Sequence, residues 1–300
     1  MGRGGSFIRA TFLGLLLVVG VLVVGCGGGG SPENRELRIG NIGWDENTVV
    51  AQLTKVLLED ELGYGNVEIQ QVDLGLVFEG VSSGDLDAFQ DVWLPNHAQL
   101  LNEVEGDVVQ LGDWYQGQTE FGIGVPSYMT DVTTIGDLNQ SNVDQIYGIE
   151  PGSVIMERIP EEVEPAYNLQ PKLVESSTAG MLSEVDRLYN DGEEFAFLPW
   201  RPHWMNQVYD FKYLEDPLDA LGELNDSAEI SSIVNEDLPE EDPVALAFME
   251  AITLTEDQVN EIEFEINEAG DPETGVRNWL KDNRAVVEPW LEAARNAQGS

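Results

Sequence analysis

The stretch LRIGNIGWDENTVVAQLTKVLLEDELGYGNVEIQQV, residues 37–72, decides the fold class of this chain. Apolar alternation over residues 37–42 predicts a short strand. Apolar residues then recur at helical spacing over residues 48–62, and Gly63 follows as a stop signal for that helix. Alternation returns over residues 67–72 and predicts a second strand. A strand, a helix and a strand in this order predict an α/β unit with a parallel sheet.

The same rhythm continues downstream and indicates a second lobe. The pattern predicts a helical turn over residues 77–82 and a third strand over residues 88–93. Residues 121–126 predict a strand that ends in proline, where we expect the chain to cross into a smaller α/β lobe. The further elements predicted for that lobe are strands at 145–149, 172–175 and 194–198 and helices at 155–163 and 178–189.

The C-terminal third is predicted to be mostly helical. Thr255-Glu256-Asp257-Gln258 has the pattern of a capping box, and Gly270 ends the helix that follows it. Residues 272–282 and 284–297 predict two final helices. The expected division of the chain is lobe 1 at 36–125 and 201–300 and lobe 2 at 126–200.

The N-terminal segment has the pattern of an export signal. Residues 1–9 carry two arginines and no acid, and residues 10–25 are uncharged and mostly Leu, Val and Gly, which predicts a signal peptide over residues 1–25. The segment Val23-Val24-Gly25-Cys26 resembles the lipobox of bacterial lipoproteins, whose cysteine is acylated. We therefore expect residues 26–35 to be a linker anchored by lipid at Cys26, outside the cytoplasm. The alternative is an uncleaved anchor helix with an incidental cysteine.

The composition combines an ordinary hydrophobic content with an extreme charge. Hydrophobic residues make up 42% of the chain, whereas 56 acidic residues face 14 Lys and Arg, for a net charge of −42. Loss of residues 1–25 removes two arginines and no acid, so the mature charge would be −44. Nucleic acid is excluded as a partner, because phosphate binding requires basic patches. The acidic excess indicates either a soluble surface or adaptation to high salt, where counterions screen repulsion.

The sequence contains no enzymatic motif. Cys26 is the only cysteine, so neither an intramolecular disulfide nor a cysteine metal cluster can form. His97 and His203 are the only histidines, which excludes a multi-histidine metal site. A Gly-x-Ser-x-Gly elbow and a phosphate-binding loop lysine are both lacking. We therefore expect no catalytic residues, no cofactor and no metal.

The seven tryptophans are more informative than the acids. Trp279 and Trp290 lie on predicted amphipathic helices and are expected in the core. Trp44, Trp93 and Trp200 each stand at or just after the end of a predicted strand. Ligands of open α/β sheets bind beyond the carboxyl ends of the strands, so these three indoles are predicted to project into a cleft. The alternative for each indole singly is a packing role.

Several fragments carry a resemblance to a known family. In combination they resemble the glycine-betaine/proline-betaine substrate-binding proteins of ABC importers, and the resemblance extends over about residues 37–290. The fragments are Asn41-Ile42-Gly43-Trp44-Asp45, Ser83-Gly84-Asp85-Leu86-Asp87-Ala88, Trp93-Leu94-Pro95-Asn96-His97, Gly148-Ile149-Glu150-Pro151-Gly152-Ser153-Val154-Ile155-Met156, Pro199-Trp200-Arg201-Pro202-His203-Trp204-Met205 and Lys212-Tyr213-Leu214-Glu215-Asp216-Pro217.

The resemblance implies both a fold and a function. The fold would be a two-lobed periplasmic-binding-protein fold, type II-like, with a ligand cleft between the lobes. The function would be that of an extracytoplasmic receptor, not an enzyme. It would deliver glycine betaine, or a related quaternary-ammonium osmolyte, to the permease subunits of an ABC importer for osmoprotection.

The resemblance also implies a cage for the ligand's trimethylammonium group, formed by Trp44, Trp93 and Trp200. The physics agrees, because a methylated cation cannot donate hydrogen bonds and must be held by aromatic faces in a desolvated site. Each indole would contribute about 2 kcal/mol when desolvated.

For the ligand carboxylate, the resemblance implies the backbone amides of Val154 and Ile155 together with His97. Amides at the start of a helix suit an anion. Two departures from the family pattern stand out: Val154 replaces a common glycine, and the spacing from Trp93 to His97 is one residue short. The alternative for His97 is an exposed loop histidine. For His203, a local turn and packing role is favoured over ligand contact.

The sequence is also compatible with other ligands and with other classes of protein. Choline, carnitine, proline betaine or ectoine could replace glycine betaine in the same class of receptor. Choline has no carboxylate, so a carboxylate pocket argues against it. Alternatives of a different class are a catalytic surface lipoprotein and a purely structural one.

Overall fold

The computed structural model describes Gly2 and residues 35–298. The predicted signal peptide and Cys26 lie outside these residues. Within the described part of the chain, no helix is long and apolar enough to cross a membrane.

The first sheet has five strands and buries its central strand on both faces. Its order is β2-β1-β3-β13-β4, with β2 and β3 parallel to β1, and with β13 antiparallel to both β3 and β4. Nearly every residue of β3 is buried, as expected of a strand with layers on both faces. The strands are β1 Glu36–Asn41, β2 Asn66–Gln71, β3 Ala88–Leu94, β4 Val108–Gln110 and β13 Glu229–Asn235.

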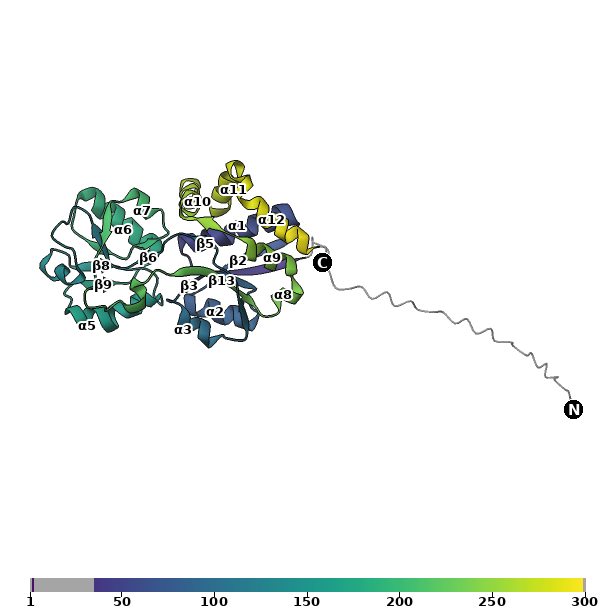
Figure 1. Ribbon diagram of the computed structural model, residues 1–300, viewed down its shortest axis with the longest axis horizontal. Helices are drawn as coiled ribbons and strands as arrows, with labels where there is room; N and C mark the ends of the chain where they lie inside the picture. Colours follow the sequence, from purple (N-terminus) through teal and green to yellow (C-terminus); the bar gives the residue numbers. More distant parts are fainter. Residues whose placement is uncertain (1, 3–34, 299–300) are drawn as a thin grey trace. The chain divides into compact units, whose positions relative to one another are not determined.

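The two crossover helices of this sheet lie on opposite faces (Figure 1). The chain passes from β1 to β2 through α1, Asp45–Leu62, and then back to β3 through α2, Leu74–Ser83. Crossovers are right-handed, so a reversal of direction moves the next helix to the other face. A gap between the loops therefore opens beyond the carboxyl ends of β1 and β3, which is where open sheets bind ligands.

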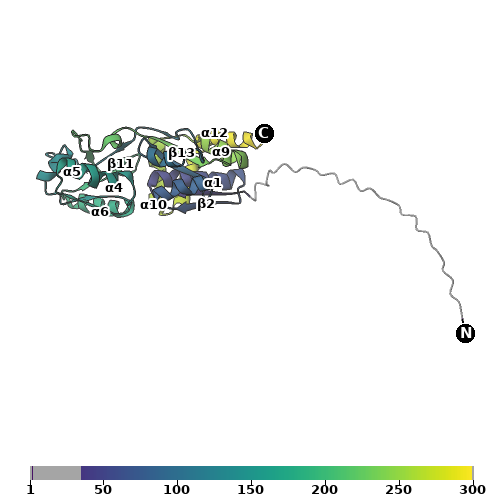
Figure 2. The same cartoon turned by 90° about the horizontal axis from the view of Figure 1, so that it is seen from below.

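The C-terminal helices complete the layer around α1, which contacts α10, α11 and α12. Figure 1 labels all four helices, and Figure 2 shows α1, α10 and α12 from below. The predicted capping box forms: the Thr255 side chain caps the Gln258 amide, and the Gln258 side chain accepts from the Thr255 amide. The remaining helices of this lobe are α3 Ala98–Glu103, α8 Leu238–Glu241, α9 Pro243–Ala251, α10 Glu256–Ala269, α11 Pro272–Asp282 and α12 Arg284–Ala297.

The second sheet has the order β12-β7-β10-β8-β9. Strand β8 is parallel to β9 and β10, and β7 is antiparallel to β10 and β12. Its strands are β7 Gly124–Pro126, β8 Gln145–Tyr147, β9 Lys172–Val174, β10 Ala196–Phe197 and β12 Phe211–Tyr213. The helical segments here are η2 Ile135–Gln140, α4 Val154–Arg158, η3 Ile159–Val163, α5 Glu164–Tyr167, α6 Thr178–Asp191, α7 Met205–Val208 and η4 Gly222–Asn225.

Two short strand pairs supplement the main sheets. Strand β6, Glu120–Phe121, is antiparallel to β11, Trp200–Arg201. Strand β5, Tyr115–Gln116, is parallel to β14, Leu254–Thr255.

The structure differs from the sequence-based expectations at three places. The strand predicted over residues 121–126 is two strands, because β6 pairs with β11 while β7 joins the second sheet. The helix predicted over residues 155–163 widens into a π-turn at Ile159–Val163, where Pro160 has no amide to donate. Strand β12 lies beyond residue 200 yet pairs with β7, so the second sheet extends into the range assigned to lobe 1. Apart from this strand, the lobe boundaries stay a prediction.

Candidate functional site

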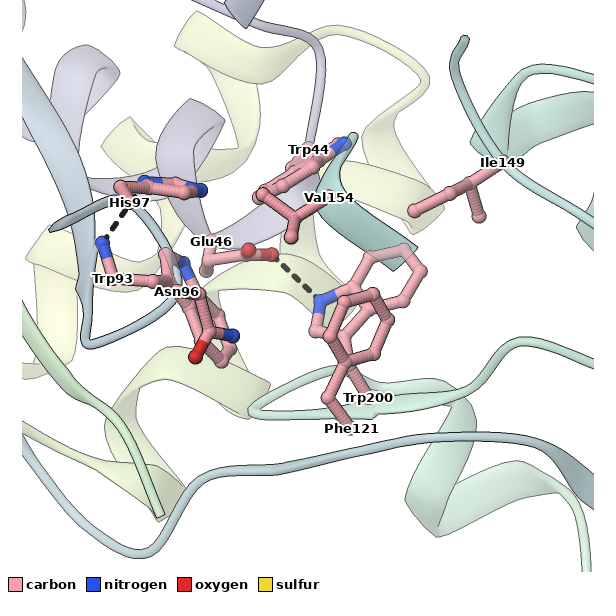
Figure 3. A pocket seen from close by; sticks show the side chains of 9 residues that line it. All are labelled: Trp44, Glu46, Trp93, Asn96, His97, Phe121, Ile149, Val154 and Trp200. Carbon is pink, nitrogen blue, oxygen red and sulfur yellow. Dashed lines mark hydrogen bonds between the residues drawn. The ribbon is translucent and has the colours of Figure 1, made fainter. Parts of the chain in front are cut away.

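A small cavity lies where loops from both sheets meet, and it gathers most of the candidate residues (Figure 3). Its walls come from the carboxyl ends of β1, β3 and β8, from the starts of α1 and α4, and from the β6–β11 pair. The residues that line it are Trp44, Glu46, Trp93, Asn96, His97, Phe121, Ile149, Val154 and Trp200.

The turn between β1 and α1 fixes the position of Trp44. Gly43 adopts a positive φ of 92°, which favours glycine, and its amide donates to Asn41 Oδ1 over 2.7 Å. The Ile42 amide donates to Asn47 Oδ1 over 2.9 Å. These bonds tie the end of the strand to the first turn of the helix. Trp44, the residue before α1, therefore stands at the cavity with only 6% of its surface exposed.

Four aromatic rings form a closed circuit around the cavity. Trp44, Trp93, Phe121 and Trp200 follow one another, and neighbouring centroids are 6.3–6.5 Å apart along all four sides. A cation is attracted to an aromatic ring within about 6 Å of the ring centroid, a distance similar to the separation of these neighbouring rings. The spacing therefore suits a compact cation at the centre of the circuit.

Carboxylates hold two of these indoles by their edges. Trp200 Nε1 donates to Glu46 Oε2 over 3.0 Å, and Trp93 Nε1 donates to Asp91 Oδ1 over 2.9 Å. Both tryptophans are 3% exposed. A hydrogen bond at the ring edge fixes the plane of an indole and satisfies its only polar group.

The carboxyl groups that hold these indoles are themselves buried, and burial disfavours their charged form. Glu46 is fully buried, and desolvation, followed by the charges of Asp91 and Glu263, raises the pKa of its carboxyl well above the usual range. Burial raises the pKa of Asp91 to about 8. Glu46 occupies the first turn of α1, where the helix dipole favours a negative charge but offsets only part of the desolvation cost.

His97 is a neutral hydrogen-bond donor at the edge of the aromatic circuit. Its side chain is 2% exposed, and its Nδ1 accepts from the Trp93 amide over 3.1 Å. Burial lowers the pKa of His97 to about 3, so the ring is neutral near pH 7 and its proton is on Nε2. The alternative of an exposed loop histidine is therefore wrong.

The start of α4 approaches the cavity from the second sheet. Val154 is the first residue of the helix and lines the cavity, whereas the Ile155 side chain is fully buried and does not line it. The first amides of a helix have no acceptor within it, so they are available to an anion. The Ser153 hydroxyl, also buried, has no partner among the described residues.

His203 and Trp204 stand outside the cavity lining. His203 is fully buried, and its Nε2 donates to Asp45 Oδ2 over 2.7 Å while its Nδ1 accepts from the Met205 amide. The Trp204 amide donates to Glu263 Oε2 over 2.6 Å. These contacts match the packing role favoured for His203.

Sequence reasoning missed four of the lining residues. Phe121 belongs to a predicted strand, but the sequence did not show which side of that strand its side chain occupies. Glu46 could not be distinguished from the other acids among the 56 of the chain. Asn96 and Ile149 carried no signal of their own, although both belong to fragments that carried the family resemblance.

Comparison with known proteins identifies the family. Residues 35–282 match the model described as the substrate binding domain of ABC-type glycine betaine transport systems. The glycine betaine/carnitine transport binding protein GbuC of Listeria monocytogenes serotype 1/2a (strain 10403S) is 30% identical over 166 residues. That match covers 54% of this chain and 54% of GbuC, about half the length of each.

Solved structures have the same two-lobed fold. Lactococcal OpuAC, in its closed conformation with glycine betaine, is 28% identical with a TM-score of 0.76, covering 86% of this chain and 100% of that one. A choline-binding protein of an ABC transporter, in complex with choline, has a TM-score of 0.76 at 24% identity and covers 87% of this chain and 97% of that one. The two-lobed periplasmic-binding-protein fold expected from the sequence is confirmed. The chain belongs to the family of substrate-binding domains of ABC-type glycine betaine transport systems, which are solute receptors and not enzymes.

Proposed function

We propose that this protein is the extracytoplasmic receptor that binds glycine betaine and delivers it to the permease subunits of an ABC importer for osmoprotection. The observation that carries this proposal is the circuit of Trp44, Trp93, Phe121 and Trp200 above the buried carboxylate of Glu46. Such a site suits a cation that has no hydrogen to donate. Aromatic faces attract its charge and methyl groups without requiring a donor.

In the proposed complex, the trimethylammonium group lies against the indoles of Trp44, Trp93 and Trp200. The ligand carboxylate accepts from His97 Nε2 and from the amides of Val154 and Ile155. Two features support this orientation. The His97 proton is on Nε2, since Nδ1 is already an acceptor, and Val154 begins a helix.

Related ligands fit the same cation site. Choline, carnitine and proline betaine also carry quaternary nitrogens. Ectoine has no quaternary nitrogen, so the cation site favours it less. GbuC is a glycine betaine/carnitine transport binding protein, and a choline-binding protein shares the fold. A neutral histidine donor in the cavity favours ligands with a carboxylate over choline, whose hydroxyl is uncharged.

We also propose that Cys26 is lipid-modified after cleavage of residues 1–25, which anchors the receptor to the outside of the cell membrane. Support comes from the lipobox-like segment Val23-Val24-Gly25-Cys26 and the apolar run before it. A tethered receptor stays close to its permease, which raises its effective concentration there.

The acidic surface is proposed to be an adaptation to high salt. Nine of the described Lys and Arg side chains pair with carboxylates, yet most of the acids in the described residues have no such partner. The repulsion among these acids is long-ranged at low ionic strength and is screened by salt.

Replacement of any cage tryptophan should weaken ligand binding. Trp44→Ala, Trp93→Ala and Trp200→Ala each remove about 2 kcal/mol of desolvated cation–π attraction, a loss of roughly thirtyfold in glycine betaine affinity by calorimetry. Trp279→Ala, the matched control in the core of α11, should instead lower the free energy of unfolding by about 3–5 kcal/mol and leave the affinity of the folded protein unchanged. Parental affinity in all three cage variants would rule out the cage.

His97→Asn should separate glycine betaine from choline. The asparagine oxygen can still accept from the Trp93 amide, but the donor that replaces Nε2–H is too short to reach the ligand. Loss of a hydrogen bond to a carboxylate should cost about 1.5–3 kcal/mol, or more than tenfold in glycine betaine affinity. Choline affinity should change by no more than about twofold, which corresponds to about 0.5 kcal/mol. Equal losses for both ligands would mean that His97 only positions Trp93.

Cys26→Ser should abolish membrane anchoring. The variant should appear in the soluble fraction or as an unprocessed precursor, because a serine cannot be acylated through sulfur. Mass spectrometry of the native N-terminus is the direct measurement. Stable anchoring requires more than one acyl chain, so at least two should be found. An unmodified Cys26 within an intact leader would contradict the anchor.

The melting temperature should rise steeply with salt. The Debye length falls from about 30 Å at 0.01 M to about 3 Å at 1 M, which screens most of the repulsion among surface carboxylates. Calorimetric melts across this range of KCl test the effect, with and without glycine betaine. Ligand binding should survive at 1 M KCl, since a dry cage is poorly screened. A flat melting temperature would mean that the acids serve solubility alone.

A further inference from the structure

Three carboxylates near the aromatic circuit are buried without a counter-ion among the described residues. Glu46 from α1 and Asp91 from β3 are fully buried, and Glu263 from α10 is 1% exposed. Each uses one oxygen to accept a single N–H, from Trp200 Nε1, Trp93 Nε1 and the Trp204 amide respectively. The second oxygen of each carboxylate has no partner among the described residues.

The charged groups around this cluster do not neutralise it. Asp45, beside Glu46 on α1, accepts from His203, and Arg201 is paired with Glu256 at 3.4 Å. In the described part of the chain, no Lys or Arg forms an ion pair with any of the three carboxylates, and no group of acids and histidines is arranged to hold a metal ion.

Two further titratable groups that face the cluster, His97 and Tyr115, are neutral near pH 7. His97, which lines the same cavity, has its pKa lowered to about 3 by burial. Burial, followed by the charge of Glu256, raises the pKa of Tyr115 on β5. Neither of these two groups therefore supplies a positive charge to the three carboxylates.

Three like charges cannot all remain ionised in a water-poor site with no cation. Desolvation is the largest cause of the raised pKa at Glu46, Asp91 and Glu263, and Asp91 reaches about 8. Such groups titrate as a unit, with protons shared among them. Near neutral pH, the cluster therefore retains at least one proton.

Only Glu46 connects this cluster to the ligand cavity. It lines the cavity wall and points among the indoles, as Figure 3 shows, while Asp91 and Glu263 do not line the cavity. A quaternary ammonium arriving in the aromatic circuit would bring a fixed positive charge next to Glu46. It carries no N–H and can neither give up a proton nor satisfy an oxygen by hydrogen bonding.

We propose that ligand capture is an exchange of charges: the cation enters the aromatic circuit, and a proton shared by Glu46, Asp91 and Glu263 leaves for the solvent. This inference rests on the proposed function and extends it by coupling ligand binding to the release of a proton. The O–H bond of one carboxyl group breaks, its electron pair stays on the carboxylate, and water or buffer accepts the proton. The total charge of the buried site is the same before and after binding.

The exchange determines whether ligand affinity rises or falls with pH. The cation stabilises the carboxylate, so the cluster pKa is lower in the complex than in the free protein. Release occurs between the two values, and there affinity must rise with pH. For one proton, the rise is at most about tenfold per pH unit. Below the pKa of the complex and above that of the free protein, affinity is independent of pH.

Calorimetric titration of the purified full-length protein counts the protons without any mutation. Glycine betaine and choline are each titrated at pH 7 in buffers with different enthalpies of ionisation, and the slope of the observed enthalpy gives the number released. Choline does not titrate in this range, so any proton must come from the protein. For every ligand that binds, we expect the release of more than zero and no more than about one proton, with affinity rising with pH below the value of about 8 to which burial raises the pKa of Asp91.

Three variants identify which residues release the proton. Glu46→Gln keeps an acceptor for Trp200 Nε1 but cannot ionise, so both proton release and the rise of affinity with pH should shrink. His203→Gln should leave the release intact, which excludes that imidazole. Asp242→Asn is the matched control, because Asp242 is a buried carboxylate of the same lobe that is already paired with Arg35 and Tyr64. It should release protons like the parent.

The outcomes separate this inference from the proposed function. Binding of glycine betaine or choline with the same enthalpy in every buffer and a flat pH profile would overturn proton exchange and leave the receptor function standing. Parental release in Glu46→Gln would overturn the role of Glu46. Failure of every quaternary-ammonium ligand to bind would overturn the proposed function and the exchange with it. The buffer series decides the question even if Glu46→Gln does not fold.

Discussion

The site depends on one physical constraint, which is that the proposed ligand carries a positive charge without any hydrogen to donate. Water solvates such a cation weakly, and protein carboxylates cannot grip it by hydrogen bonds. Aromatic faces in a desolvated space are the remaining option. Tight burial of Trp44, Trp93 and Trp200 follows from this requirement, as does the use of Asp91 and Glu46 to hold two indoles by their edges.

The fold supplies the geometry that such a cage needs. Reversal of the crossover direction between α1 and α2 opens a gap at the ends of β1 and β3, where Trp44 and Trp93 stand. The opposite wall comes from the β6–β11 pair, which contributes Phe121 and Trp200. Segments far apart in sequence therefore close one ring. The Trp200–Glu46 and His203–Asp45 hydrogen bonds join the β11 segment to the first turn of α1.

Negative charge has two different roles in this molecule. On the surface, acids are solvated, respond to ionic strength and partly pair with the few arginines. Beneath the cage, Glu46, Asp91 and Glu263 are beyond the reach of salt, and their charge must be balanced by a proton or a ligand. The same residue types thus act through screening in one place and through desolvation in the other.

The sequence by itself determined the α/β class, the two final helices, the capping box at Thr255 and the meeting of Trp44, Trp93 and Trp200 at one cavity. The spacing of apolar residues, the helix caps and the order of elements along the chain are local properties that a sequence displays directly. Only the tertiary structure decided that Phe121 completes the circuit, that His97 is buried and neutral, and that Glu46 differs from the other acids. These properties arise from what surrounds a side chain, and burial by distant segments leaves no periodic trace in the sequence.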